Sequence, residues 1–147
     1  MTNMIQNAKE QAAALAMAAY RAAAADGTLP EAEVKTAPVE IPKDTANGDY
    51  TTTFALAAAK ALGKPPRVIA QALLDHMDLT GTYFTSAEIA GPGFLNFRLG
   101  DAWYAGVMNA VETERDAYGT NDSLTGKKIM VEFVSANPTG PMHMGNA

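Results

Sequence analysis

Two strand-like segments joined by a Gly-Pro-Gly turn constrain the fold of this chain most strongly. Residues 83–89 and 93–99 both have strand character, and Gly91-Pro92-Gly93 separates them. A break of that kind between two strand-like runs predicts an antiparallel hairpin. The sheet that contains this hairpin needs a layer of helices over one face, which is the arrangement of an α+β domain.

Helical periodicity precedes the hairpin. Apolar residues recur every three to four positions near the N-terminus, which predicts a helix over about residues 3–25. Residues 51–62 return to the same period and are predicted to form a second helix. Pro66 can open a third helix at its first turn, which is expected to end near Met77. A short strand is predicted at residues 39–42.

A further helix and a change of domain are predicted after the hairpin. Asp101 is the candidate N-cap of a helix over about residues 102–118, in which four side chains are expected to face inward: Trp103, Val107, Met108 and Val111. The sequence predicts an N-terminal α+β domain over residues 1–118, with helices covering a small antiparallel sheet, and a linker over 119–127. The nearly continuous apolar run 128–134 is typical of a parallel strand buried on both faces.

Composition excludes several classes of function. The 147-residue chain has a net charge of −5, which argues against a broad basic surface for nonspecific nucleic-acid binding. It has no cysteine, and its two histidines are too few for a histidine-rich metal site, so no metal site is expected. No run of about 18 apolar residues indicates a membrane span. A cytoplasmic protein with no membrane partner fits these features.

The last residues form a polar, Gly/Pro-rich loop after that apolar run, which is where an α/β domain binds phosphates. His143 and Asn146 can donate hydrogen bonds to a phosphate, and Gly145 lets the backbone approach a ligand. Glu132 could hold a cationic substrate, and Asn137 could bind the polar groups of an amino acid. Each feature alone is weak, whereas their order along the chain is specific.

In that order, residues 131–147 resemble the ATP-binding signature of class I aminoacyl-tRNA synthetases, in the form found in the arginyl-tRNA synthetase family. Upstream, Val39-Glu40-Ile41-Pro42-Lys43-Asp44 and Ala90-Gly91-Pro92-Gly93-Phe94-Leu95-Asn96-Phe97 are similar to the N-terminal additional domain of that family. The resemblance covers most of the chain. It implies that residues 128–147 begin a Rossmann-like catalytic domain that is truncated here.

The resemblance also implies roles for residues of the terminal loop. His143, Gly145 and Asn146 match positions that bind ATP, and the first of these stabilises the transition state of adenylation. Asn146 stands where many members have a second histidine, so a charged donor is missing there. Glu132, Ser135 and Asn137 match positions that contact arginine. A carboxylate suits a guanidinium because the two groups pair in a planar, bidentate manner.

A second candidate site lies on the strand that starts at Gly93. Because side chains alternate along a strand, Leu95, Phe97 and Leu99 are expected in the core, while Phe94, Asn96 and Arg98 share the other face. An aromatic ring, an amide and a cation suit one unstacked nucleotide. The resemblance implies contact between this domain and the D-loop of tRNA. The alternative is that Phe94 packs under a helix and Asn96 ends in a turn.

The resemblance therefore implies an arginine–tRNA ligase as the parent protein, with tRNA(Arg), ATP and L-arginine as partners and Mg²⁺ accompanying ATP. The 147 residues alone are expected to be inactive. Residues 128–147 are expected to be disordered, to fold back onto the domain, or to self-associate with a second copy. Two alternatives stay open, namely a non-catalytic RNA-binding module and an α+β protein-interaction domain with an accidental terminal loop.

Overall fold

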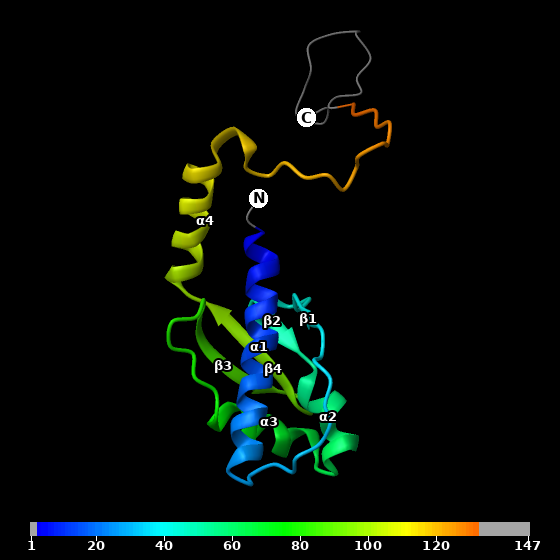
Figure 1. Cartoon of the computed structure of the whole chain (residues 1–147), viewed down its shortest axis with the longest axis vertical. Helices are drawn as coiled ribbons and strands as arrows, with labels where there is room; N and C mark the ends of the chain where they lie inside the picture. The colour runs from blue at the N-terminus through cyan, green and yellow to red at the C-terminus, as the bar shows by residue number, and fades with distance from the viewer. Residues whose placement is uncertain (1–2, 133–147) are drawn as a thin grey trace.

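The protein, described by a computed structural model over residues 3–132, is an α+β domain with a four-stranded antiparallel sheet (Figure 1). Its elements follow in the order α1 (Met4–Ala25), β1 (Val39–Glu40), the 3-10 turn η1 (Thr45–Asn47), β2 (Tyr50–Thr52), α2 (Phe54–Leu62), α3 (Pro66–Asp75), β3 (Phe84–Ala90), β4 (Phe94–Leu99), α4 (Asp101–Glu114) and the 3-10 turn η2 (Arg115–Ala117). The predicted α+β class is confirmed.

The sheet has the strand order β1-β2-β4-β3, and β3 and β4 form the predicted hairpin. The prediction of a helix over 51–62 was wrong at its start, because residues 50–52 form β2 and α2 begins only at Phe54. β2 lies between β1 and β4, with Thr52 opposite Val39 and Tyr50 opposite Phe97. Its three residues are aromatic or β-branched, which suits a strand, but a run this short has no readable period.

The helix α1 covers one face of the sheet, and the core lies between them. Five of its seven buried residues are alanine: Ala8, Ala12, Ala16, Ala19 and Ala23. Small side chains let the helix approach the sheet closely. The sheet contributes Leu95 and Phe97, which are fully buried, and Leu99 packs against the same core, as the alternation along β4 predicts.

One ionic contact joins the ends of α1 and α3. His76 is the C-cap residue of α3, its Nε2 lies 2.7 Å from Asp26 Oδ2, and its Nδ1 lies 2.7 Å from the Ala72 carbonyl oxygen. Asp26 is the C-cap residue of α1. The contact therefore fixes two helices at their C-terminal ends. The interpretation of His76 as a helix-end residue agrees with this position.

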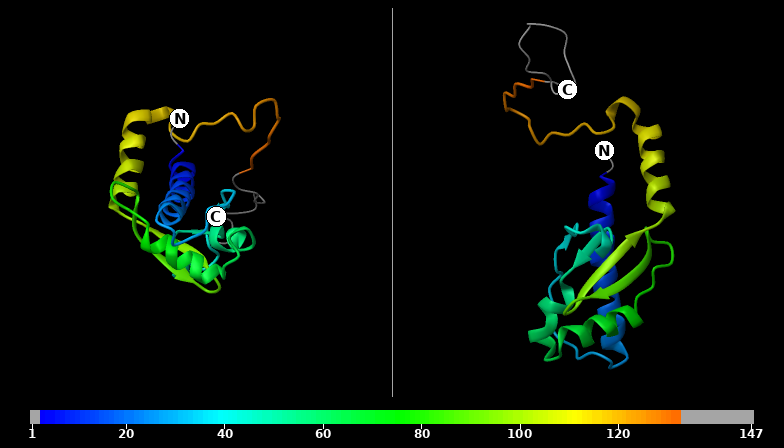
Figure 2. Two further views of the ribbon diagram at one scale, coloured as in Figure 1. Left: turned by 60° about the horizontal axis from the view of Figure 1, so that its bottom comes forward. Right: turned by 180° about the vertical axis from the view of Figure 1, so that it is seen from behind.

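The prediction for α4 needs two corrections. Gly100 is the N-cap residue, and Asp101 lies in the first turn, where an acidic side chain complements the helix dipole. Met108 and Val111 face solvent, with 61% and 38% of their surface exposed. Figure 2 shows the reason, since α4 extends past the sheet and leaves most of its length uncovered. Its first turn is attached to α1 through Trp103, whose Nε1 donates to the Met4 carbonyl at 3.1 Å.

The predicted strand over 128–134 is not formed in its described part. Residues 127–132 have no regular secondary structure, and Ile129, Met130 and Val131 are exposed. A strand needs a neighbour to accept its backbone hydrogen bonds, and no strand pairs with this segment among residues 3–132. None of the helices in that range is long and apolar enough to cross a membrane.

Candidate nucleic-acid interface

A pocket of about 300 Å³ opens on the face of the sheet opposite α1. Residues from three parts of the chain line it: Pro42 and Asn47 before β2, Thr51 on β2, and Ala90, Gly91, Phe94 and Asn96 from the hairpin. Two of the three nucleotide-binding residues predicted on β4 therefore meet in one cavity. The third, Arg98, lies beside the turn that carries Asn47.

Asn96 lies at the centre of this face. Its neighbours in the ladder are Thr51 on β2 and Glu88 on β3, and only 3% of its surface is exposed. Within residues 3–132 its side-chain amide makes no hydrogen bond to another side chain or to the backbone. The Oγ1 atom of Thr51 is buried and has no hydrogen-bond partner in the described part of the chain either. The pocket lining thus contains an amide and a hydroxyl without hydrogen-bond partners among residues 3–132, and the sequence pattern had not indicated the hydroxyl.

Phe94 forms a wall of the pocket and is only partly buried. It does not belong to the hydrophobic core, and none of the aromatic pairs among the described residues includes its ring. Gly91 lies beside it, and a Cβ atom added there would stand 3.7 Å from the ring. The ring therefore contributes an aromatic surface to the lining of the pocket. Asn96 lies within β4, so the part of the alternative that places it in a turn was wrong.

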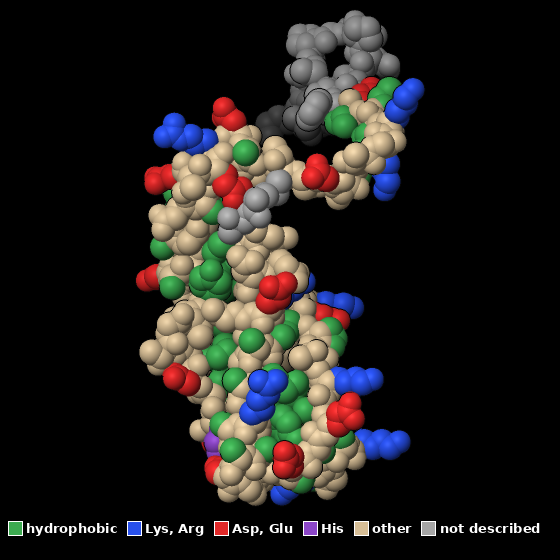
Figure 3. Space-filling view, viewed as in Figure 1, with side chains coloured by type: hydrophobic (Ala, Val, Ile, Leu, Met, Phe, Trp, Pro, Cys, Tyr) green, Lys and Arg blue, Asp and Glu red, His purple; other side chains and the backbone are tan. Residues whose placement is uncertain are grey.

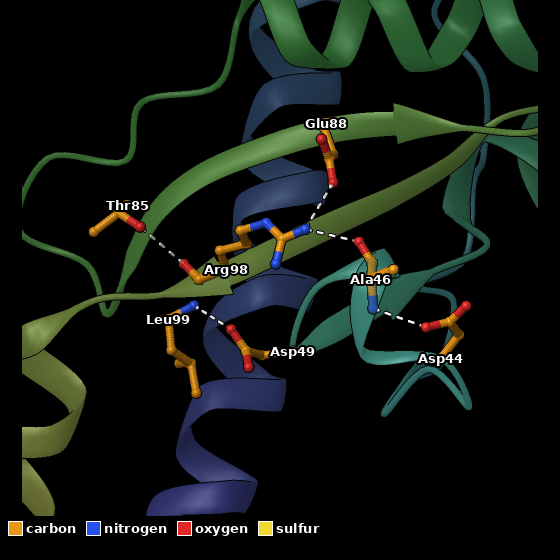
Figure 4. A network of polar contacts seen from close by, with 7 residues as sticks. All are labelled: Asp44, Ala46, Asp49, Thr85, Glu88, Arg98 and Leu99. Carbon is orange, nitrogen blue, oxygen red and sulfur yellow. Dashed lines mark hydrogen bonds and ion pairs between the residues drawn. The ribbon is translucent and has the colours of Figure 1, made fainter.

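The segment 44–49 carries Asn47 to the edge of the pocket and is attached closely to β4. The Asp49 amide donates to the Phe97 carbonyl at 2.8 Å, and Asp49 Oδ2 accepts from the Leu99 amide at 2.8 Å (Figure 4). Gly48 has a φ of 91°, and a Cβ atom there would stand 2.8 Å from the Phe97 oxygen. Only glycine combines this dihedral with such a close approach.

Arg98 contacts the same segment from the exposed side of β4. Its Nη2 donates to the Ala46 carbonyl at 2.7 Å and lies 3.6 Å from Glu88 Oε1. Figure 4 shows the guanidinium between Glu88 on the neighbouring strand and the turn that contains Ala46. About 45% of the Arg98 side chain is exposed. One of the three predicted residues is therefore already engaged with the protein itself.

Two other cations border the pocket although the chain is acidic overall. Lys43 follows the lining residue Pro42 and is exposed. Arg67 on α3 donates from Nη1 to the carbonyl of the lining residue Gly91 at 3.1 Å. Together with Arg98, which bonds to the residue before Asn47, they make three cations that adjoin residues of the pocket lining. Phosphate groups that flank a bound base would meet such cations.

A larger groove of about 680 Å³ lies on the opposite side of the molecule, between α1 and residues 36–39. Its floor consists of alanines and Met17, and Lys9, Glu10 and Arg21 stand at its border. Figure 3 views this side and shows hydrophobic side chains gathered beside α1 between charged ones. None of the described residues that line this groove is aromatic, so it offers no ring for a base to stack on, and the smaller pocket is the better candidate.

Of the residues predicted to bind ATP and arginine, Glu132 alone lies among the residues that the structure describes. Glu132 is exposed in an irregular segment and does not line the pocket. Ser135, Asn137, His143, Gly145 and Asn146 lie outside the described residues, as does the fold of the segment 133–147. Within residues 3–132 no three acidic, histidine or cysteine side chains come together to hold a metal ion.

Comparison with known proteins gives a consistent result. Residues 3–99 match the family described as arginyl tRNA synthetase N terminal domain. The chain is 44% identical over all its 147 residues to an arginine–tRNA ligase of Acetivibrio thermocellus, and 40% identical over the same length to that of Caldanaerobacter subterraneus. It spans 26% of each of these relatives, about a quarter of their length.

A solved structure supports the fold. The arginyl-tRNA synthetase of Plasmodium falciparum matches 65% of this chain and 16% of its own with a TM-score of 0.51, at 14% sequence identity. At that identity the match concerns the fold alone. It agrees with the α+β arrangement of helices around a small antiparallel sheet.

Proposed function

The chain belongs to the arginyl-tRNA synthetase family through its N-terminal domain, and from this premise we propose that its pocket binds one unstacked nucleotide of the D-loop of tRNA(Arg). The observation that carries the proposal is the joint placement of Phe94 and Asn96 in a cavity outside the core. Proteins that read single-stranded RNA combine an aromatic surface with polar groups for the base edge.

Each part of the pocket has a definite task in this proposal. The ring of Phe94 stacks on the base, an interaction worth about 1–3 kcal/mol. The Asn96 amide offers both donors and an acceptor to the base edge, and the Thr51 hydroxyl offers a further donor or acceptor. The base edge then satisfies polar groups that the protein leaves without partners.

The cations around the pocket supply the part of the affinity that does not depend on sequence. We assign the contacts with the sugar-phosphate backbone to Lys43, Arg67 and Arg98, which adjoin or bond to residues at the pocket. The exposed face of the Arg98 guanidinium is free to approach a phosphate. Three such contacts predict binding that weakens as salt is added.

We extend the proposal to the parent protein as a class I synthetase that activates arginine with ATP and transfers it to tRNA in the cytoplasm. Residues 128–147 then begin its Rossmann-like catalytic domain. His143, Gly145 and Asn146 bind ATP, which enters as its Mg²⁺ complex, and Glu132, Ser135 and Asn137 bind arginine. The 147-residue chain supplies tRNA contacts and has no aminoacylation activity of its own.

The test is binding of a tRNA(Arg) transcript to the 147-residue chain and to its Phe94→Ala and Asn96→Ala variants. We expect each substitution to weaken binding by about tenfold, corresponding to about 1.4 kcal/mol. Tyr104→Ala is the matched control, since Tyr104 is an exposed aromatic residue on α4 that does not line the pocket. Equal affinities for all four proteins would remove the proposed role of the pocket.

A further inference from the structure

We propose that Arg98 is a positioning residue, which holds the turn η1 so that Asn47 stands at the edge of the pocket and sharpens its selectivity for the bound base. The proposal rests on the nucleotide-binding function proposed for the same pocket. In this role Arg98 acts through its hydrogen bond to the turn and not only through its positive charge.

The first argument concerns how the turn is attached. Inside the turn, Asp44 Oδ1 accepts from the Ala46 amide at 2.9 Å, and the Asn47 amide donates to the Asp44 carbonyl at 3.0 Å. Among the described residues, the one hydrogen bond that reaches residues 44–47 from another element is that from Arg98 Nη2 to the Ala46 carbonyl. Without Arg98 the turn keeps its internal bonds, and the adjoining Asp49 keeps its two bonds to β4, but residues 44–47 lose their own attachment to that strand.

The second argument concerns the group that Arg98 binds. The Ala46 carbonyl and the Asn47 amide belong to one planar peptide unit. A hydrogen bond to that carbonyl therefore restricts the orientation of the peptide plane next to the Cα atom that carries the Asn47 side chain. Asn47 itself is exposed, and its side chain makes no hydrogen bond within residues 3–132. Its orientation at the pocket consequently depends on the orientation of the turn.

The third argument concerns the shape of the guanidinium. Its Nη2 atom makes both contacts, since it donates to the Ala46 carbonyl at 2.7 Å and lies 3.6 Å from Glu88 Oε1. The pair with Glu88 is half-exposed and loose at 3.6 Å, so it orients the side chain more than it stabilises the fold. Lysine would keep the charge of Arg98 but replace the rigid, planar guanidinium with a strongly hydrated ammonium on a flexible stem, so substitution by lysine separates the two roles.

The two roles of Arg98 predict different behaviour. If Arg98 only contacted a phosphate, Arg98→Lys would preserve binding, and Arg98→Gln would lower the dependence of log K on log salt by about 0.7. If Arg98 positions the turn, Arg98→Lys keeps the salt dependence but loses selectivity for the base. The second pattern is the one we expect.

The experiment has two readouts on the 147-residue chain. Amide ¹⁵N relaxation of the free protein reports order in residues 45–48, and titration compares a tRNA(Arg) transcript with transcripts in which single D-loop nucleotides are abasic. For Arg98→Lys we expect lower order in the turn and a ratio of affinities, intact to abasic, that falls by roughly threefold or more. Arg21→Lys on α1 is the matched control, and neither readout should change.

Wild-type order in residues 45–48 together with an unchanged ratio in Arg98→Lys would overturn the positioning role. Loss of order with an unchanged ratio would overturn it as well, because the turn would then not affect selectivity. If the wild-type chain itself does not distinguish intact from abasic transcripts, the proposed function of the pocket fails. In that case, amide ¹⁵N relaxation of the free protein still tests whether Arg98 holds the turn in place.

Discussion

Thr51 and Asn96 stand directly opposite each other in the β2–β4 ladder, on the face of the sheet turned away from α1. Opposed residues of an antiparallel pair project to the same side. The Thr51 hydroxyl is buried without a partner, and the Asn96 amide makes no hydrogen bond within residues 3–132. A buried polar group without a partner costs about 1–3 kcal/mol. The free protein is therefore destabilised locally at the point where a ligand could supply the missing hydrogen bonds.

Thr51→Val should accordingly leave the free energy of unfolding unchanged or raise it by up to about 1 kcal/mol, because it removes an unpartnered hydroxyl at nearly constant volume. The neighbouring residue provides the control. Thr52 is also buried, but its Oγ1 donates to the Pro38 carbonyl at 3.2 Å, so Thr52→Val should destabilise by about 1 kcal/mol. Urea denaturation measures both. Equal losses of unfolding free energy in the two variants would contradict the conclusion that the Thr51 hydroxyl has no hydrogen-bond partner.

Phe94 and Phe97 lie on the same strand, and their substitution should affect tRNA binding and the free energy of unfolding differently. Phe97 is fully buried in the core, and Phe97→Ala should cost about 3–5 kcal/mol of unfolding free energy. Phe94 lies outside the core, so Phe94→Ala should cost distinctly less while it weakens tRNA binding. Chemical denaturation and a binding titration on each variant test this. A Phe94→Ala variant as unstable as Phe97→Ala would show that the ring is a core residue.

Gly48→Ala should disturb the pocket more than alanine at another glycine of similar conformation. Gly48 has a φ of 91°, and an added Cβ atom would meet the Phe97 oxygen at 2.8 Å. Gly27 has a φ of 82°, but an added Cβ atom there would meet nothing within 4 Å. Gly27→Ala should therefore cost only the dihedral strain, about 1–2 kcal/mol, without a steric clash. Gly48→Ala should lose more stability in thermal unfolding and also weaken tRNA binding. Identical melting temperatures would argue against the close approach of the turn to β4.

The contact between His76 and Asp26 predicts a pH dependence of stability. The hydrogen bond from His76, with further bonds from Thr28, lowers the pKa of Asp26 to about 2. The hydrogen bond to Asp26, with a second to the Ala72 carbonyl, raises the pKa of His76 above its ordinary 6.5. The stabilisation from Asp26 is present above pH 3.8 and is lost as the pH falls toward 2. That from His76 is present below pH 6.5 and is lost as the pH rises through the higher folded value.

The contact should therefore contribute most between about pH 4 and 6.5. The urea midpoint of the wild-type chain, compared with that of His76→Gln, measures this contribution across the pH range. The difference between the two proteins should be largest inside the window and shrink on both sides. A constant difference from pH 3 to pH 9 would contradict the ionic contact.

Local patterns allowed a large part of the fold to be predicted. The hairpin followed from Gly91-Pro92-Gly93 between two strand-like runs, and the alternation along β4 assigned Leu95 and Phe97 to the core. These inferences succeed because a strand has a period of two residues, which depends on the backbone alone. The inward orientation predicted for Met108 and Val111 was wrong because the same helical period fits a face that no element within residues 3–132 covers.

The sequence by itself determined the element types, the two faces of β4 and the family of the chain, since these depend on residue order, period and motif. Tertiary structure decided which residues share the pocket, because Asn47, Thr51 and Phe94 come from separate segments that meet only when β2 pairs with β4. It also decided that Arg98 binds the Ala46 carbonyl, 52 residues earlier in the chain. No local pattern encodes such a contact, because its distance depends on how two strands and a turn pack together.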